Sequence, residues 1–324
     1  MDKSIKIKKG NLANKKGYIE RFGLAALLLG LSGFFTMLNS NFITLYNIQN
    51  IFKQSAINGL IAYGMTFVIL LGCIDLSVGS ILALVGYLVG NLIVLFQIPV
   101  GIAIIMGLML GIILGIINGC LVAKVKLQPF IATLITMTVY RGITLIISNG
   151  LPVRNLDKAS PFIGLLNKGK VGIFPISMII FVGVLGILWV LLHKTVFGRH
   201  LYATGGNEEA ARLSTIQTSK IKIKGYAISG FLSAVAAILY ISRYNSIYPN
   251  AGQGAELDAI AAVVIGGTSM SGGKGLITGT FIGALIIGVL NNGLNLLGIS
   301  SFYQEVIKGL VILLAVVADK RKKI

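Results

Sequence analysis

The sequence predicts an all-α polytopic membrane protein of about ten transmembrane helices, and its composition and its long apolar runs are the observations that predict it. The chain has 324 residues, of which 55% are hydrophobic and only 12% are charged, whereas an average soluble protein carries about 25% charged residues. Uncharged apolar runs recur along most of the chain, and a run of about 17 to 25 such residues crosses the hydrocarbon core as a helix. A transmembrane barrel would show short alternating strands instead.

Ten candidate spans follow one another along the chain, and one of them is short. They cover residues 22–38, 52–71, 78–96, 100–122, 129–148, 173–193, 225–242, 257–270, 276–296 and 303–318. A helix over the eighth segment would rise only about 20 Å, which is less than the hydrocarbon thickness of about 30 Å. We therefore expect a short or re-entrant helix at this point in the chain.

The basic residues predict how the chain is oriented. In a ten-span arrangement 20 of the 28 lysines and arginines lie on one side, and six of these fall between Lys194 and Lys224. Such a bias marks the cytoplasmic side and accounts for the net charge of +18 without a nucleic-acid partner. We expect a multi-pass plasma-membrane protein with both termini in the cytoplasm. Its parts would be a basic N-terminus over 1–21, one transmembrane domain over 22–318 and a basic tail over 319–324.

The fourth span carries four glycines at a spacing of four residues: Gly107, Gly111, Gly115 and Gly119. This spacing puts them on one face of a helix, and small residues there let a second helix backbone approach closely. We interpret this stripe as a helix-packing surface rather than as a ligand site.

The stretch "GGTSMSGGKG", residues 266–275, has the glycines and the lysine of a nucleotide-binding loop. A phosphate-binding loop needs a glycine five positions before its Gly-Lys pair and a serine or threonine after it. The chain has Thr268 and Gly275 at those two positions. We therefore predict a tight cytoplasmic turn here, with glycines that allow close backbone approach.

Residues for catalysis or for metal binding are not gathered in the sequence. Cys73 and Cys120 lie in or beside apolar segments, which favours neither a disulfide framework nor a metal site. His193 and His200 stand without a nearby nucleophile or metal-ligand partner. We expect no catalytic residue and no metal site.

The longest cytoplasmic loop, 194–224, contains a predicted short helix in "NEEAARLSTI". Asn207 suits its N-cap, and Glu208 and Glu209 fall in the first turn, where the helix dipole favours negative charge. Ala210 and Leu213 give the helix a small apolar patch, and Ile216 is less well aligned with it. These residues fit a docking helix and an ordinary solvated helix about equally well.

The segment "GNEEAARLSTI" resembles the cytoplasmic coupling segment of ABC-importer permeases of the ribose and monosaccharide type. Four further segments resemble the same family in the same order, so that the likeness covers nearly the whole chain. They are "GMTFVILLGCIDLSVGS", "PFIATLITMTVYRGI", "ELDAIAAVVIGGTSMSGGKG" and "IGVLNNGLNLLGISSFYQEVIKGLVILLAV". One position departs from the family, which commonly has glycine where this chain has Thr215.

The resemblance implies a permease subunit that moves a monosaccharide, ribose first, into the cytoplasm by alternating access. It also implies three partners: a second copy of the chain, a cytoplasmic ATPase with two nucleotide-binding domains, and an extracytoplasmic sugar-binding protein. ATP and magnesium would bind to the ATPase, so that this subunit needs no cofactor. The coupling positions that the resemblance assigns are Asn207, Glu208, Glu209, Ala210, Ala211, Arg212 and Leu213.

Polar residues within the spans are candidates for the sugar path, because a polyol needs hydrogen-bond donors and acceptors along its route. They are Asn58, Asp75, Ser77, Asn118, Thr133, Thr136, Asn291, Asn292 and Asn295. The alternative is that they join helices to one another, at about 0.6 kcal/mol each. For Asp75 and Ser77 we favour capping at the start of the third helix.

An ion-coupled secondary sugar transporter is the alternative function. It would need titratable groups within the membrane, and the few that occur are accounted for by pairing or by caps. Glu305 and Lys308, for example, are three residues apart and are expected to pair along one helix face. On the outer side, residues 149–172 and 243–258 are the surfaces expected to meet the binding protein.

Overall fold

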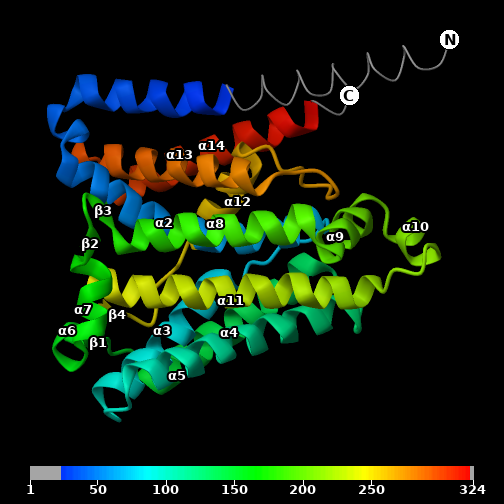
Figure 1. Cartoon of the computed structure of the whole chain (residues 1–324), viewed down its shortest axis with the longest axis horizontal. Helices are drawn as coiled ribbons and strands as arrows, with labels where there is room; N and C mark the ends of the chain where they lie inside the picture. Colours follow the sequence, from blue (N-terminus) through cyan, green and yellow to red (C-terminus); the bar gives the residue numbers. More distant parts are fainter. Residues whose placement is uncertain (1–22, 322–324) are drawn as a thin grey trace.

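The computed structural model describes residues 23–321, and the long helices within this part run side by side along one common direction (Figure 1). The predictions for residues 1–21 and for the last three residues of the tail lie outside the described part. The helices are Gly23–Leu38, the 3-10 helix η1 (Ser40–Ile43), α2 (Leu45–Leu70), α3 (Val78–Val94), α4 (Val100–Ala123), α5 (Pro129–Ser148), α6 (Leu156–Ala159), α7 (Pro161–Lys168), α8 (Ile176–Lys194), α9 (Val196–Gly206), α10 (Glu208–Leu213), α11 (Thr218–Tyr244), α12 (Ala255–Ile265), α13 (Ile277–Leu296) and α14 (Ser301–Arg321).

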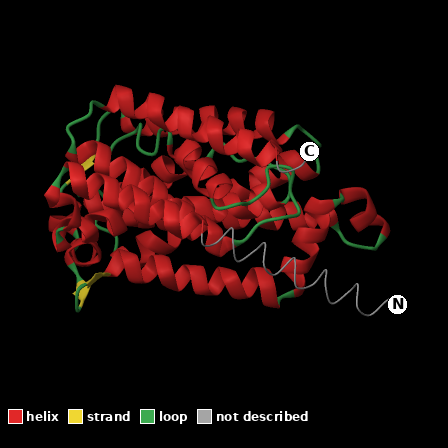
Figure 2. Ribbon diagram, turned by 90° about the horizontal axis from the view of Figure 1, so that it is seen from above, coloured by secondary structure: helices red, strands yellow, loops and turns green. Residues whose placement is uncertain are grey.

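Strands occur in the described residues only as two-residue pieces at one end of the bundle (Figure 2). β1 (Val153–Arg154) pairs antiparallel with β4 (Ser246–Ile247), and β2 (Lys170–Val171) pairs antiparallel with β3 (Phe174–Pro175). α6 and α7 lie at this same end, whereas α9 and α10 lie at the opposite end (Figure 1). The two ends of the molecule are therefore built from different parts of the chain.

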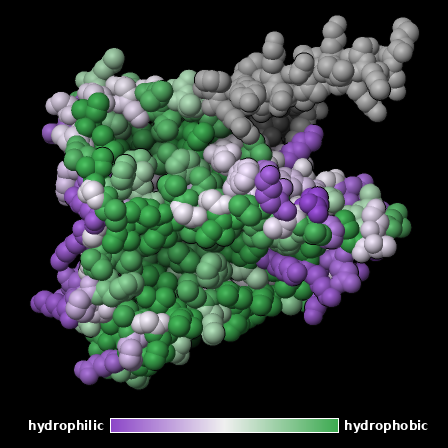
Figure 3. Space-filling model, in the orientation of Figure 1, coloured by the Kyte–Doolittle hydropathy of each residue, from purple (hydrophilic) through white to green (hydrophobic). Residues whose placement is uncertain are grey.

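The predicted all-α membrane class is confirmed. Five of the described helices are long and apolar enough to cross a membrane, namely α4, α5, α8, α11 and α13, and Gly23–Leu38 and α3 are shorter apolar helices. On the face shown in Figure 3, apolar side chains cover the middle of the molecule, and hydrophilic side chains gather towards its two ends. The number of ten spans stays a prediction.

Two helices begin earlier than the apolar runs indicated. α2 starts at Leu45 rather than at residue 52, and α11 starts at Thr218 rather than at residue 225. In α2 the hydroxyl of Thr44 accepts a hydrogen bond from the Asn47 N–H, which caps the helix ahead of its apolar part. Helical hydrogen bonding therefore continues through polar residues that a count of apolar residues leaves out.

The glycine stripe of α4 lies mainly against α11. A Cβ atom at Gly115 would overlap the carbonyl oxygen of Tyr226, and one at Gly111 would lie 2.6 Å from the carbonyl oxygen of Gly230. A Cβ atom at Gly119 would lie 2.7 Å from the Cα of Ile223, whereas Gly107 faces the side chain of Val89 in α3. The missing side chains let the backbones of α4 and α11 touch along about two turns, from Gly111 to Gly119.

α12 is shorter than expected, with 11 residues and a rise of about 16 Å. The chain that enters it runs along α3, because Ile247 lies against Gly86 and Gly252 lies against Gly79 in the first turn of α3. Arg141 of α5 donates to the carbonyl oxygens of Pro249 and Ala251 at 2.7 and 2.8 Å. This arginine satisfies irregular backbone inside the bundle, as a membrane interior requires.

Candidate functional site

A polar cavity of about 660 Å³ opens between α2, α12, α13 and α14, beside the end of α11. This volume is within the range of about 300 to 1,000 Å³ that is usual for small-molecule sites. Tyr240 and Tyr244 of α11 form part of its wall, together with ten side chains that carry amide or charged groups. These ten are Gln54, Asn58, Gln253, Glu256, Asp258, Asn291, Asn295, Gln304, Glu305 and Lys308.

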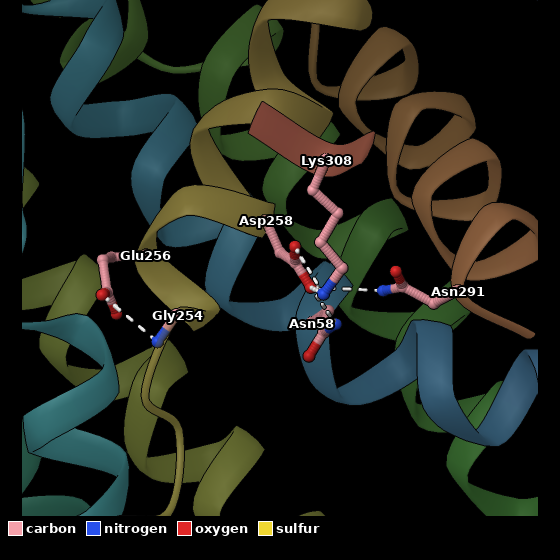
Figure 4. A network of polar contacts seen from close by, with 6 residues as sticks. All are labelled: Asn58, Gly254, Glu256, Asp258, Asn291 and Lys308. Carbon is pink, nitrogen blue, oxygen red and sulfur yellow. Dashed lines mark hydrogen bonds and ion pairs between the residues drawn. The ribbon is translucent and has the colours of Figure 1, made fainter. Parts of the chain in front are cut away.

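Asp258, in the first turn of α12, is the centre of the hydrogen-bond network in this cavity (Figure 4). Its Oδ2 accepts from Asn58 Nδ2 of α2 at 3.3 Å and from Asn291 Nδ2 of α13 at 3.2 Å. Lys308 Nζ of α14 lies 3.3 Å from Oδ1 and 3.4 Å from Oδ2. One carboxylate of α12 thus joins the two helices that follow it, α13 and α14, to the distant α2.

The expected pair between Glu305 and Lys308 is not formed, because Lys308 is paired with Asp258 instead. The Asp258 side chain is 9% exposed and the Lys308 side chain is 27% exposed. Each of these largely buried charges is therefore stabilised by the opposite charge of the other. Glu305 and Lys308 both line the cavity. The nearer and more buried acid, however, comes from α12, and local spacing on α14 carries no information about it.

Asn291 has one polar atom without a partner. Its Nδ2 donates to Asp258, but its buried Oδ1 accepts no hydrogen bond from the described residues. A buried acceptor left without a donor is unfavourable by about 1 to 3 kcal/mol. Because Asn291 lines the cavity, a hydroxyl group of a bound molecule is a suitable donor for it.

Three of the sequence-predicted path residues, Asn58, Asn291 and Asn295, line this cavity. Asn292, on the next position of α13, forms a reciprocal pair with Asn47 through two hydrogen bonds of 2.9 Å. Thr136 is buried and donates to the carbonyl oxygen of Thr133.

Asp75, Ser77 and Asn118 form a separate buried cluster that does not line the cavity. Asp75 Oδ1 accepts from the Ser77 N–H at 3.0 Å and from Ser77 Oγ at 2.7 Å, and its Oδ2 accepts from Ser229 Oγ at 3.0 Å. Asn118 Nδ2 donates to Ser77 Oγ at 2.7 Å. This cluster joins the turn before α3 to α4 and α11.

Sequence reasoning missed Asp258, Gln54 and Gln304 as cavity residues. Asp258 stands at the end of the segment assigned to the outer surface, and only the folding of residues 248–254 into the bundle brings it to the cavity. Gln54 and Asn58 are four residues apart on α2. That spacing would have put Gln54 on the same helix face as a residue already singled out.

The short helix predicted in the loop 194–224 is present as α10, at the end of the molecule opposite the strands (Figure 1). Asn207 Oδ1 accepts from the Ala210 N–H at 2.9 Å and caps the helix. Glu208 forms an ion pair of 2.6 Å with Lys222 of α11. Ala211 is buried, whereas Leu213 is 79% exposed, so that the helix is fixed on one side and presents an apolar side chain on the other.

The glycine-rich turn 266–275 lies directly against the helix that leads into α10. Gly273 N–H donates to the carbonyl oxygen of Leu70, the last residue of α2, at 2.9 Å. Tyr202 of α9 donates to the carbonyl oxygen of Gly275 at 2.8 Å, and burial raises the pKa of this tyrosine to about 12. A Cβ atom at Gly205 would overlap the Leu70 carbonyl oxygen. Three segments therefore meet in backbone contact next to α10.

Residues 47–316 match a protein-family model described as the permease component of the branched-chain amino acid transport system. The chain belongs to this family. It is 57% identical to a ribose import permease of Bacillus subtilis over 89% of this chain and 88% of that protein. It is 46% identical to a ribose import permease of Escherichia coli K12, over 95% and 96% of the two chains. These relatives confirm the resemblance to ribose-type ABC permeases.

Similarity also extends to a relative named for another sugar. The chain is 40% identical to the D-allose transport system permease protein of Escherichia coli K12, over 92% of this chain and 90% of that one. No solved structure matches the chain. Within the described residues, no group of three His, Cys, Asp or Glu side chains is placed to hold a metal ion.

Proposed function

We propose that this chain is the membrane-spanning permease subunit of an ATP-driven importer that brings a neutral monosaccharide, ribose first, into the cytoplasm. The observation that carries the proposal is the cavity around Asp258. It is rich in carboxamides, which donate and accept hydrogen bonds, and its central carboxylate is already paired with Lys308. Such a wall suits an uncharged polyol.

The likeness to the ribose import permeases favours ribose over other sugars. The likeness to the D-allose permease keeps allose as the next candidate. In this proposal the sugar-binding protein selects the sugar, and the permease supplies a path of hydrogen-bonding groups.

α10 is the proposed contact with a cytoplasmic ATPase, which binds ATP and magnesium in place of this chain. The exposed Leu213 of α10 offers an apolar side chain to a groove on the ATPase. The ion pair between Glu208 and Lys222 transmits a movement of α10 to α11. The termini and α10 then face the cytoplasm, and the end with the strands faces outward to the binding protein. A second copy of the chain completes the transport unit.

Alternating access in this proposal is a rigid movement between two packings of the helices. ATP binding closes the ATPase, the two coupling helices move with it, and the cavity changes the side to which it opens. A ligand shifts such an equilibrium only through its different affinity for the two states.

Reconstitution tests this function. The chain, a candidate tandem-domain ATPase and a sugar-binding protein are placed in lipid vesicles, and uptake of radiolabelled ribose is measured with and without ATP. We expect ATP-dependent uptake that Leu213→Asp abolishes by breaking the ATPase contact. Lys220→Asp, an exposed change in the same loop, serves as the control for altered charge. Uptake that needs no ATPase would contradict the proposal.

An ion-coupled transporter is the second candidate, because Asp258 is a buried acid on the wall of the cavity. Its pairing with Lys308 favours a fixed charge over one that takes up and releases protons. Collapsing the proton gradient while ATP is maintained separates the two functions. Uptake should continue if ATP drives it and should stop if protons do.

A further inference from the structure

A second polar pocket lies at the end of the bundle that carries the strands, between η1, α2 and α13. Its volume is about 400 Å³, which is again within the usual range for a small-molecule site. Six carboxamide side chains line it: Asn41, Asn47, Asn50, Gln54, Asn292 and Asn295. No carboxylate is among its lining residues, and its one charged side chain, Arg243, already donates to oxygens of Asn50. Its chemistry therefore favours a neutral ligand with many hydroxyl groups.

We call this second pocket the outer pocket. Several of its lining residues are already held in place by hydrogen bonds to one another. Asn47 and Asn292 form their reciprocal pair there, and Asn47 also donates to the carbonyl oxygen of Phe42 at 2.9 Å. The guanidinium of Arg243, which also lines the pocket, donates to the backbone and side-chain oxygens of Asn50. The pocket is thus preformed, which limits the entropy lost when a ligand binds.

The outer pocket and the Asp258 cavity share two wall residues, Gln54 and Asn295. On α2 the residues Asn47, Asn50, Gln54 and Asn58 follow one another at spacings of three, four and four, and therefore lie on one helix face. We call these four residues the amide face of α2. It extends over about 16 Å of helix and ends at the hydrogen bond from Asn58 to Asp258.

Gln54 differs from the other members of the amide face in having no partner. Its side chain makes no hydrogen bond to any other described residue, whereas Asn47, Asn50 and Asn58 are all bonded. A glutamine that served only to join helices would be bonded across the interface. Instead, Gln54 offers its donors and its acceptor at the boundary between the two pockets.

We infer that the outer pocket is a first binding site for the neutral sugar, and that Gln54 passes the sugar from it to the Asp258 cavity. This inference rests on the proposed function of the chain. The sugar exchanges hydrogen bonds along the amide face, so that no single position has to bind it tightly. Gln54 acts on the transported sugar itself, and the coupling of α10 to the ATPase does not depend on it.

The test compares sugar imported with ATP hydrolysed, in vesicles that hold the chain with its ATPase and its binding protein. Radiolabelled ribose uptake and phosphate release are measured in the same preparation. In Gln54→Leu we expect ATP hydrolysis, stimulated by the ribose-loaded binding protein, to stay within about twofold of the unchanged protein. Ribose imported per ATP should fall about three- to tenfold, as the loss of a hydrogen bond predicts.

Two further variants serve as controls. Gln54→Asn keeps the carboxamide and should retain more ribose per ATP than Gln54→Leu. Gln128→Leu removes a glutamine that is exposed and lines neither pocket, and it should import as the unchanged protein does.

Each other outcome decides against the inference in a distinct way. Unchanged ribose per ATP in Gln54→Leu would overturn the role of Gln54 and leave the proposed function intact. An equal fall in hydrolysis and import would show a structural role only. Absence of ATP-driven import in the unchanged protein would remove the proposed function and this inference with it.

Discussion

At the scale of single residues, Asp258 shows how much one side chain depends on its neighbours. Its carboxylate accepts hydrogen bonds from two carboxamides and pairs with Lys308, and these partners come from α2, α13 and α14. A buried charge that loses its only counter-charge destabilises a protein by about 3 to 5 kcal/mol. Asp258 and Lys308 should therefore behave as a unit.

A double-mutant cycle measures this coupling. Lys308→Met leaves the buried carboxylate of Asp258 unpaired and should lower the free energy of unfolding by about 3 kcal/mol. Asp258→Asn should lower it less, because Lys308 is the more exposed partner. The double variant should recover about 1 to 3 kcal/mol relative to the sum of the two losses. Thermal unfolding of the purified protein in detergent gives the comparison, and simple additivity would contradict the coupling.

Thr215 stands where the resemblance to ribose-type permeases led us to expect a glycine. Its φ is +65°, in the left-handed region that glycine enters freely and a β-branched residue enters rarely. The position directly follows Ser214, the C-cap of α10, and its N–H donates to the carbonyl oxygen of Arg212. The backbone conformation that favours glycine is thus retained although the glycine is not.

Thr215→Gly should stabilise the protein by roughly 0.5 to 1 kcal/mol. The relief of left-handed strain, about 1 to 2 kcal/mol, exceeds the added entropy of the unfolded chain, about 0.5 to 1 kcal/mol. Ser214→Gly is the matched control, since Ser214 has an ordinary φ of −83° and should lose stability instead. Equal shifts in unfolding temperature for the two variants would contradict the strain argument.

At the scale of elements, the contact of α9 with the end of α2 and with the turn 266–275 connects α10 with the cavity around Asp258. α9 leads into α10 through Asn207, and the turn 266–275 follows α12, which carries Asp258. A movement of α10 thus has a short packed route to the cavity wall. The route depends on glycines, because its contacts are between backbones.

Two adjacent glycines of α9 provide a matched test of this junction. A methyl group at Gly205 would overlap the Leu70 carbonyl oxygen, whereas one at Gly206 would meet nothing within 4 Å. Gly205→Ala should lower the free energy of unfolding by about 1 to 3 kcal/mol and should reduce sugar-stimulated ATP hydrolysis. Gly206→Ala should change both by little. Similar behaviour of the two variants would show that the junction is loosely packed.

At the scale of the whole molecule, the apolar face and the two polar ends in Figure 3 suit a protein whose long helices cross a bilayer. The end with β1–β4, α6 and α7 is separated from the end with α9 and α10 by the length of the long helices (Figures 1 and 3). Lys170 belongs to the first end and Lys220 to the region just after α10, and both are exposed. In the proposed orientation they lie on opposite sides of the membrane.

Cysteine labelling tests this orientation. Lys170→Cys and Lys220→Cys are made separately in a background with Cys73→Ala and Cys120→Ala, and intact cells are treated with a membrane-impermeant maleimide. Lys170→Cys should react in intact cells, and Lys220→Cys should react only after the membrane is opened. Labelling of both in intact cells, or the reverse order, would contradict the orientation.

The sequence by itself determined the membrane class, the glycine stripe of α4, the cap of α10 and the permease family. The first three depend on residues close together in the chain: apolar runs, a spacing of four, or an asparagine before two glutamates. The family depends on several such local segments in a fixed order along the chain. The short α12 was also expected, because its apolar run is too short to span. Such local patterns are sufficient to predict these features, because they determine where a helix forms and which of its faces is buried.

The tertiary structure alone decided which polar residues meet. It brought Asp258 to Lys308 in place of the expected Glu305, gathered Asp75 with Ser229, and aligned Gln54 with the boundary of two pockets. These partners are separated by tens to hundreds of residues, and the position of Asp258 depends on how the chain before α12 folds back along α3. A carboxylate in an apolar interior pairs with whatever donor the packing places beside it, and the order of residues along the chain does not specify that donor.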